Sequence, residues 1–168
     1  RPDAILWLCK MHLNFSTKAQ TLALLKDNLS AASIAPMCIF SQSEWQSNRD
    51  KCLEGIKAKI ANGPWIIRSS CKREDTSTAS NAGKFLSITD VAMADLGTSI
   101  DQVFLSYEEP AGDDEVLIQP MLENVIRSGV AFSHDPNTCS PYRIINWSDS
   151  EDTTVVTGGT GGRTWIQA

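Results

Sequence analysis

The chain has 168 residues, 42% of them hydrophobic and 21% charged, which suits one folded core and excludes a disordered or collagen-like chain. Its net charge of -5 provides no basic field for a phosphodiester backbone, so we expect no nucleic-acid partner. No apolar run approaches the roughly 18 residues of a membrane span, and the start of the chain lacks the order of a signal peptide. We therefore expect a cytoplasmic protein without a membrane partner.

The cysteines are odd in number and scattered, with no Cys-x-x-Cys pair, and only His12 and His134 could join them as metal ligands. This pattern favours reduced thiols over a structural zinc site. The five are Cys9, Cys38, Cys52, Cys71 and Cys139. Because the first residue is Arg and not Met, we expect a domain excised from a longer polypeptide or a processed chain.

The first predicted elements are a helix and a short strand. Ser16 and Thr17 precede an apolar stripe that repeats every three or four residues, which predicts a helix over 17–29. The apolar run at 34–40 then predicts a buried strand, with Pro36 at its start or at a sheet edge.

The second predicted helix has signals at both ends. Ser41 and Glu44 form a Ser-x-x-Glu capping box ahead of a periodic apolar segment, and Gly63-Pro64 is a matching C-terminal stop. A strand is predicted at 65–68, and 69–83 is a polar loop rich in Ser, Thr, Asn and Gly. The pattern therefore places a long loop directly after a buried strand.

Apolar alternation resumes at 85–88, and 89–106 predicts a helix that is broken or loosened around Gly97. An acidic loop follows at 107–114. The second half of the chain is predicted to be mostly β, with its last two strands joined by the Gly-rich turn at 157–162. The candidate strands are 116–118, 130–132, 143–147, 154–157 and 164–167.

This order of elements predicts an α+β protein with helices early and meandering antiparallel strands late. We expect two lobes that join near 115–122. The N-terminal lobe would span 1–115 and the β-rich second part 116–168, the latter incomplete at its C-terminus.

A candidate phosphate site follows the strand at 65–68. Arg68 leaves this strand at the mouth of a loop of small residues, where a planar guanidinium and accessible backbone N–H groups could hold phosphate oxygens. The alternative is a solvated loop whose Arg68 pairs with Glu74 or Asp75.

Two segments together resemble the nucleotide-binding domain of the phosphoenolpyruvate synthase and pyruvate phosphate dikinase family, a branch of the ATP-grasp fold. The first carries the family's Arg-Ser-Ser, Glu-Asp and Ser-x-Ala-Gly motifs, at Arg68, Ser69, Ser70, Glu74, Asp75, Ser80, Ala82 and Gly83. The second carries Gln-x-Met, Ser-Gly-Val-x-Phe and Asp-Pro-x-Thr, at Gln119, Met121, Ser128, Gly129, Val130, Phe132, Asp135, Pro136 and Thr138. A weaker third match, FSTKAQTLALL, retains Lys18 and Leu22 of a Gly-Gly-Lys-x-x-Asn-Leu segment and has lost both glycines.

The resemblance implies a two-lobed, ATP-grasp-like domain with a mixed sheet, which binds ATP and Mg²⁺ in a cleft between its lobes. The adenine would meet the backbone around Gln119, Met121 and Leu122. The phosphates would meet Lys18, Arg68, Ser80, Ala82 and Gly83. No metal ligand is assigned. Lys18 as a solvated first-turn residue, Arg68 in a structural ion pair and Met121 as a core residue stay open as alternatives.

The chain departs from the family where catalysis is concerned. The family's Gly-Leu-Gly-Glu motif has no counterpart before VVTG at 155–158, and the chain stops before the family's metal-binding carboxylate. We therefore expect the ATP-binding portion of a phosphotransferase, inactive in isolation and partnered by the remaining domains of a longer parent. The alternatives are a degenerate, non-catalytic structural or regulatory module and a domain that binds another phosphorylated or sugar-linked ligand.

Overall fold

The computed structural model describes residues 17–60, 63–71, 86–107, 111–150, 152, 154–156 and 158–168. The chain divides into two compact units, the first ending at Met121 and the second beginning at Leu122. Helices and two antiparallel sheets make it an α+β protein, as predicted. The boundary between the units lies within 115–122, and the strand at 115–120 belongs wholly to the first unit.

The first unit has a four-stranded sheet in the order β1-β4-β2-β3. Its strands are β1 (Cys38–Ser41), β2 (Trp65–Ser70), β3 (Ser87–Val91) and β4 (Glu115–Pro120). All neighbouring pairs are antiparallel, so the expected mixed sheet is wrong for the described strands. The helical crossover from β1 to β2 does make those two strands parallel to each other. They are not neighbours, because β4 lies between them, and β2 likewise separates β3 from β4.

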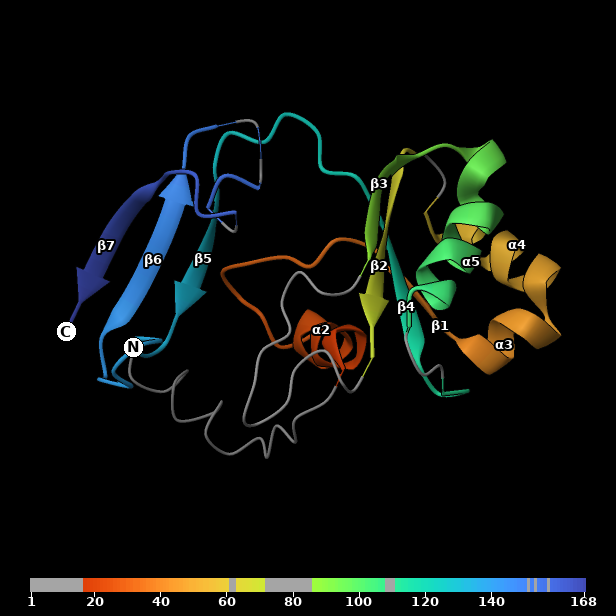
Figure 1. Cartoon of the computed structure of the whole chain (residues 1–168), viewed down its shortest axis with the longest axis horizontal. Helices are drawn as coiled ribbons and strands as arrows, with labels where there is room; N and C mark the ends of the chain where they lie inside the picture. Colours follow the sequence, from red (N-terminus) through yellow and green to blue (C-terminus); the bar gives the residue numbers. More distant parts are fainter. Residues whose placement is uncertain are drawn as a thin grey trace. The chain divides into compact units, whose positions relative to one another are not determined.

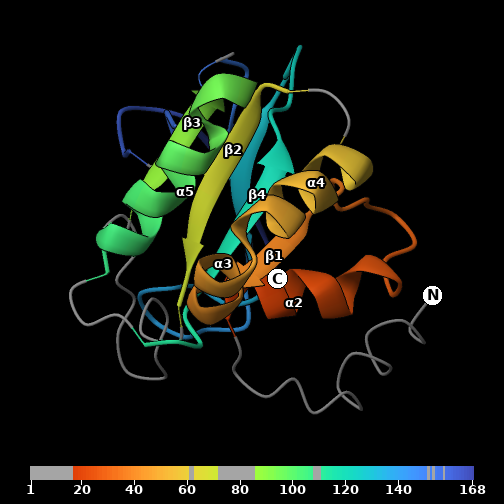
Figure 2. The same cartoon turned by 90° about the vertical axis from the view of Figure 1, so that its right-hand side faces the viewer.

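The helices of the first unit lie on both faces of this sheet. They are α2 (Lys18–Lys26), α3 (Gln42–Ser47), α4 (Arg49–Lys59) and α5 (Leu96–Leu105), with a 3₁₀ turn at Met93–Asp95. Figure 1 shows α3, α4 and α5 on one side of the strands and α2 on the other. Figure 2, viewed from the side of α3, α4 and α5, shows these helices in front of the strands.

The main core lies between the strands and the layer of α3, α4 and α5. Alternation in β2 sends Trp65 and Ile67 into this layer, where they are 2% and 0% exposed. The apolar side of α5 supplies Ile100 and Val103, both fully buried. Further members are Trp45, Ile56, Leu96, Phe104, Val116 and Ile118.

The predicted capping box is confirmed, but the helix that it begins is interrupted. Ser41 Oγ accepts from Glu44 N at 3.2 Å, and Glu44 Oε2 accepts from Ser41 N at 2.9 Å. At Asn48 the backbone leaves helical geometry, with φ -143° and ψ 47°, and α4 begins at the next residue. A short amide side chain favours such non-helical positions. One predicted helix is therefore two.

Other boundaries also differ from the prediction. α2 ends at Lys26, and β1 begins only at Cys38, two residues after Pro36, which has no N–H for a ladder. β2 continues through Ser70 into the predicted loop. In the predicted helix 89–106, the first residues belong to β3 and the 3₁₀ turn.

Gly97 is the second residue of α5, so the predicted helix is interrupted just before this glycine, at the 3₁₀ turn, and α5 is continuous through it. A Cβ at this position would lie 2.8 Å from Nη2 of Arg49. The missing side chain therefore leaves room for the Arg49 guanidinium beside α5.

The second unit has a three-stranded antiparallel sheet in the order β5-β6-β7. Its strands are β5 (Ser128–Phe132), β6 (Arg143–Ser148) and β7 (Arg163–Gln167). The predicted strand 154–157 is wrong, because 154–156 form a turn and β7 pairs with β6. Asp152 Oδ1 accepts from Thr154 N at 2.8 Å and so stabilises the turn. No helix in the described ranges is long and apolar enough to cross a membrane.

Asp101 on α5 joins all three helices of the core layer. Its Oδ1 accepts from Trp45 Nε1 at 2.7 Å and from Arg49 Nη1 at 2.9 Å, and its Oδ2 lies 2.8 Å from Arg49 Nη2. The guanidinium also stacks over the Trp45 ring, with Cζ 4.7 Å from the centroid. One carboxylate therefore fixes α5 against α3 and α4.

We predict that Asp101→Ala lowers the free energy of unfolding by about 1–3 kcal/mol, because it leaves the Trp45 indole and the Arg49 guanidinium without their acceptor. Asp101→Asn should lose less, since an amide oxygen can still accept from Trp45. Urea denaturation measures both variants. Glu54→Ala, at an exposed position on α4, is the control, and an Asp101→Ala loss no larger than the control's would contradict this role.

The Glu44 carboxylate gives a pH-dependent prediction. Hydrogen bonds from the Ser41 backbone N–H and then from the Ser41 hydroxyl lower the pKa of Glu44 below its ordinary value of 4.5. A lowered folded-state pKa contributes stability above the unfolded pKa, and this contribution disappears as pH falls through the folded one. The stability advantage of wild type over Glu44→Gln should therefore be present at pH 7 and shrink below about pH 4.5. A gap in unfolding free energy that is independent of pH would refute it.

Candidate functional site

The first turn of α2 is fastened to one end of the first sheet. Thr17 caps the helix, because its Oγ1 accepts from Gln20 N at 3.2 Å. Ala19 N donates to Ser70 Oγ, at the end of β2, at 2.8 Å. Glu115, at the start of β4, accepts from Thr17 Oγ1 at 2.6 Å and from Gln20 Nε2 at 2.9 Å. The helix therefore begins at a fixed point on the sheet.

Tyr107 holds the two strand ends together beneath this turn. Its hydroxyl accepts from Ser70 N at 3.1 Å and donates to the backbone oxygen of Glu115. Ser70 and Tyr107 are 0% and 3% exposed. Ser70 and Glu115, whose side chains accept hydrogen bonds from α2, are thus held in place by a buried tyrosine just after the end of α5.

This arrangement brings Lys18 and Arg68 to the same end of the same sheet face. Lys18 is the first residue of α2, next to Ala19. Arg68 lies two residues before Ser70 in β2, and side chains two apart in a strand share a face. Both side chains are half-buried. Lys18 and Arg68, which are fifty positions apart in the chain, therefore both lie near Ser70.

Gln119 lies on this same face, farther along the sheet. The register pairs Ser70 with Glu115, Arg68 with Leu117 and Ile66 with Gln119. Directly opposed residues share a face, so Gln119 is on the α2 side, about 13 Å along β4 from Glu115 at 3.3 Å per residue.

The other predicted site residues lie either at the boundary between the two units or outside the described residues. Met121 is the last residue of the first unit, and its N–H donates to Pro64 O at 2.9 Å. Leu122 is the first residue of the second unit and is 71% exposed. Ser80, Ala82 and Gly83 lie outside the described residues, as do Glu74 and Asp75, the alternative partners of Arg68.

Sequence reasoning missed Glu115 and Tyr107. Glu115 follows a run of acidic residues, and nothing in its spacing distinguishes it from Asp113 or Asp114. Tyr107 is the first residue of the predicted acidic loop at 107–114. Its size was the available signal, because a large aromatic residue directly after an apolar helix is often buried.

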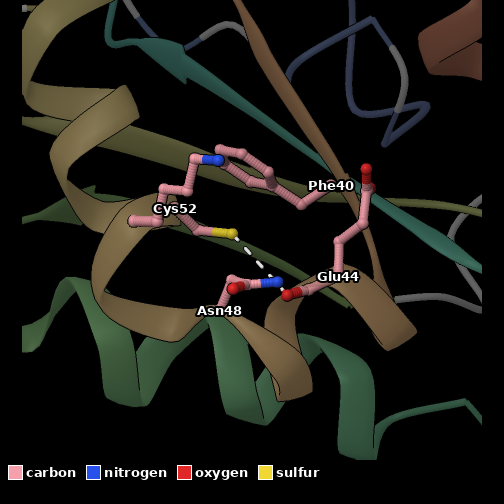
Figure 3. Close-up of a pocket in the computed structure, with 5 residues that line it drawn as sticks. Phe40, Glu44, Asn48 and Cys52 are labelled. Atoms are coloured by element: carbon pink, nitrogen blue, oxygen red, sulfur yellow. Dashed lines mark hydrogen bonds between the residues drawn. The ribbon is translucent and has the colours of Figure 1, made fainter.

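A pocket of about 230 Å³ lies elsewhere, on the side of the sheet that carries the helix layer. Figure 3 shows Phe40 of β1, Glu44 of α3, Asn48 between the two helices and Cys52 of α4 around it. The Cys52 thiol contacts Glu44 O at 3.9 Å, and burial, aided by the Glu44 charge, raises the pKa of Cys52. A protonated thiol is a poor nucleophile. The pocket contains none of the predicted site residues.

The described cysteines are free thiols, buried at Cys38, Cys52 and Cys71 and exposed at Cys139. In the part of the chain that the structure describes, no three His, Cys, Asp or Glu side chains are grouped so that they could hold a metal ion.

The sequence was also compared with known proteins. No protein-family model matches it, and no curated protein matches it. The resemblance to the phosphoenolpyruvate synthase and pyruvate phosphate dikinase family therefore depends on the sequence motifs alone.

We predict that Ser70→Ala destabilises the first unit by about 1–3 kcal/mol, because the buried N–H of Ala19 loses its acceptor. Hydrogen exchange at the Ala19 amide should speed up more than exchange in β1, since the change acts first on the docking of α2. Ser87→Ala, on an exposed position of β3, is the matched control. Unchanged exchange at Ala19 would show that Ser70 does not hold the helix.

Proposed function

We propose that this chain is the ATP-binding part of a phosphotransferase related to phosphoenolpyruvate synthase and pyruvate phosphate dikinase. The observation that carries the proposal is the shared sheet face of Lys18, Arg68 and Gln119, which lie far apart in the sequence. Their order along the face also suits the ligand. The two residues assigned to phosphates lie together, and the residue assigned to adenine lies farther along the strand direction, about 7 Å beyond the level of Arg68 and about 13 Å beyond that of Ser70.

The cations, not the helix backbone, would hold the phosphates. Within the first turn of α2, the N–H of Ala19 is bonded to Ser70 and that of Gln20 to Thr17. Positive charge would therefore come from the ammonium of Lys18, a compact charge, and from the fork of Arg68, which matches two phosphate oxygens. Mg²⁺ would enter with the nucleotide and offset the charge of its phosphate oxygens.

A degenerate module is the second candidate, and Glu115 favours it. Its carboxylate lies at the first turn of α2, bonded to Thr17 and Gln20, on the face where the phosphates would bind. A negative charge there opposes a polyphosphate. In this reading the same contacts fasten α2 to the sheet and bind no nucleotide.

We predict that Mg-ATP binds the chain with a dissociation constant of about 1 mM, as expected for few charge-assisted contacts. Arg68→Ala and Lys18→Ala should each weaken binding roughly 10- to 100-fold. Backbone amide chemical shifts measure the affinity, and the shifts should concentrate at the first turn of α2 and the end of β2. Lys26→Ala, at the other end of α2, and Arg143→Ala, on β6, are the matched controls.

Glu115→Gln separates the two candidates. If the face binds ATP, removing the carboxylate charge should tighten binding severalfold although it weakens the docking of α2. If the region is only structural, Glu115→Gln should lower the free energy of unfolding. None of the variants should then alter the amide chemical-shift changes caused by Mg-ATP. Equal ATP shifts in wild type, Arg68→Ala and Lys18→Ala would refute the ATP-binding proposal.

A further inference from the structure

β7 is an exposed strand at the edge of the second sheet. Among the described residues it pairs with β6 alone, so its other side has no partner in this sheet. All five of its residues are exposed, including Trp165 at 47% and Ile166 at 59%. An exposed apolar edge strand is a template for pairing with another strand.

The one charged residue of β7 does not protect this edge. A charged side chain on an edge strand usually hinders pairing. Arg163 is instead held over β6, with its Cζ 4.9 Å from the Trp147 ring centroid and its Nη1 3.5 Å from Asp149 Oδ2. Asp149 also accepts from Arg127 Nε at 2.8 Å. The guanidinium therefore lies over the neighbouring strand β6 and not along the open edge, and Asp149 partly neutralises its charge although the side chain stays 70% exposed.

We propose that β7 pairs with β7 of a second copy of this chain, antiparallel and centred on Trp165, to form a six-stranded sheet. This register pairs all five residues of the strand, whereas every shifted antiparallel register pairs fewer of them within β7. It also keeps equivalent faces together, since directly opposed residues share a face. Trp165 then faces Trp165 of the second copy, an aromatic cross-strand pair.

Apolar side chains would run across the joined sheet. Trp165 is opposite Ile145, which is 38% exposed, and Ile145 is opposite Ala131. Pairing two copies at Trp165 extends this row without interruption from one β5 to the other. An exposed half-row thus becomes a continuous apolar stripe.

The charges also fit a second copy. In this register Arg163 faces Gln167 of the other copy, so no like charges are opposed. Within one copy Gln167 is opposite Arg143. In the dimer it would therefore lie between Arg143 of its own copy and Arg163 of the second copy. A neutral amide at this point separates two cations that would otherwise be neighbours.

Sedimentation equilibrium of the full chain between about 10 µM and 1 mM tests the association, because an interface this small is expected to be weak. Trp165→Lys should weaken the dimer at least about 10-fold, since it opposes two ammonium groups at the centre. Ile126→Lys introduces the same charge at another exposed apolar residue and should not. A wild type that stays monomeric at 1 mM, or equal effects of the two variants, would overturn the proposal.

Gln167 tests the register without removing an apolar side chain. Gln167→Glu places a carboxylate between Arg143 of its own copy and Arg163 of the second copy, at two symmetric positions. This change should lower the dimer dissociation constant about 2- to 30-fold. Gln167→Lys should weaken it by a similar factor. Dimer affinity that does not respond oppositely to these two changes would show that the register is wrong.

Cysteine cross-linking tests the centre directly. In a Cys9→Ser and Cys139→Ser background, Trp165→Cys should form a disulfide with its own counterpart, because residues opposed across antiparallel strands have Cα atoms about 4.5–5.5 Å apart. Thr164→Cys should not, since its counterpart lies two positions away along the paired strand. Equal cross-linking at the two positions would exclude pairing centred on Trp165.

Discussion

The buried hydroxyl of Tyr107 lies between the end of β2 and the start of β4, and the candidate site depends on it. It binds Ser70 N and Glu115 O, and these same two residues receive the first turn of α2 through their side chains. Four segments of the chain, counting the one that carries Tyr107, thus share one small polar cluster on a largely apolar sheet. Because each buried polar atom there needs its partner, the position of Lys18 relative to Arg68 is set by hydrogen bonds and not by apolar packing alone.

Local signals predicted the elements that depend on local physics. The capping box at Ser41 and Glu44 and the alternation in β2 each follow from a few neighbouring residues, and the structure contains both. Pairing of distant strands has no such signal. The insertion of β4 between β1 and β2, which makes the first sheet antiparallel, and the turn at 154–156 both depend on partners elsewhere in the chain.

The sequence predicted which residues belong to the candidate site better than how they are arranged. Arg68 is recognisable because a cation follows an apolar strand and precedes small residues, and Lys18 because it begins a helix. That they share a face could not be read from either segment, since it requires the alternation of β2 and the docking of α2 together. Glu115, the acid beside them, has no pattern of its own. Only its contacts with Thr17 and Gln20 place its carboxylate beside the first turn of α2.

The position of β4 in the first sheet has a consequence for how the protein is made. β1 pairs only with β4 among the described strands, although about seventy residues are synthesised between them. A contact this distant carries a high loop-closure cost and slows folding. On the ribosome, a chain that has not reached residue 115 leaves β1 without a neighbour and the β2 to β3 hairpin with one open side. The four-stranded sheet can be completed only after β4 has been synthesised, which is the situation in which unpaired apolar strands are prone to aggregate.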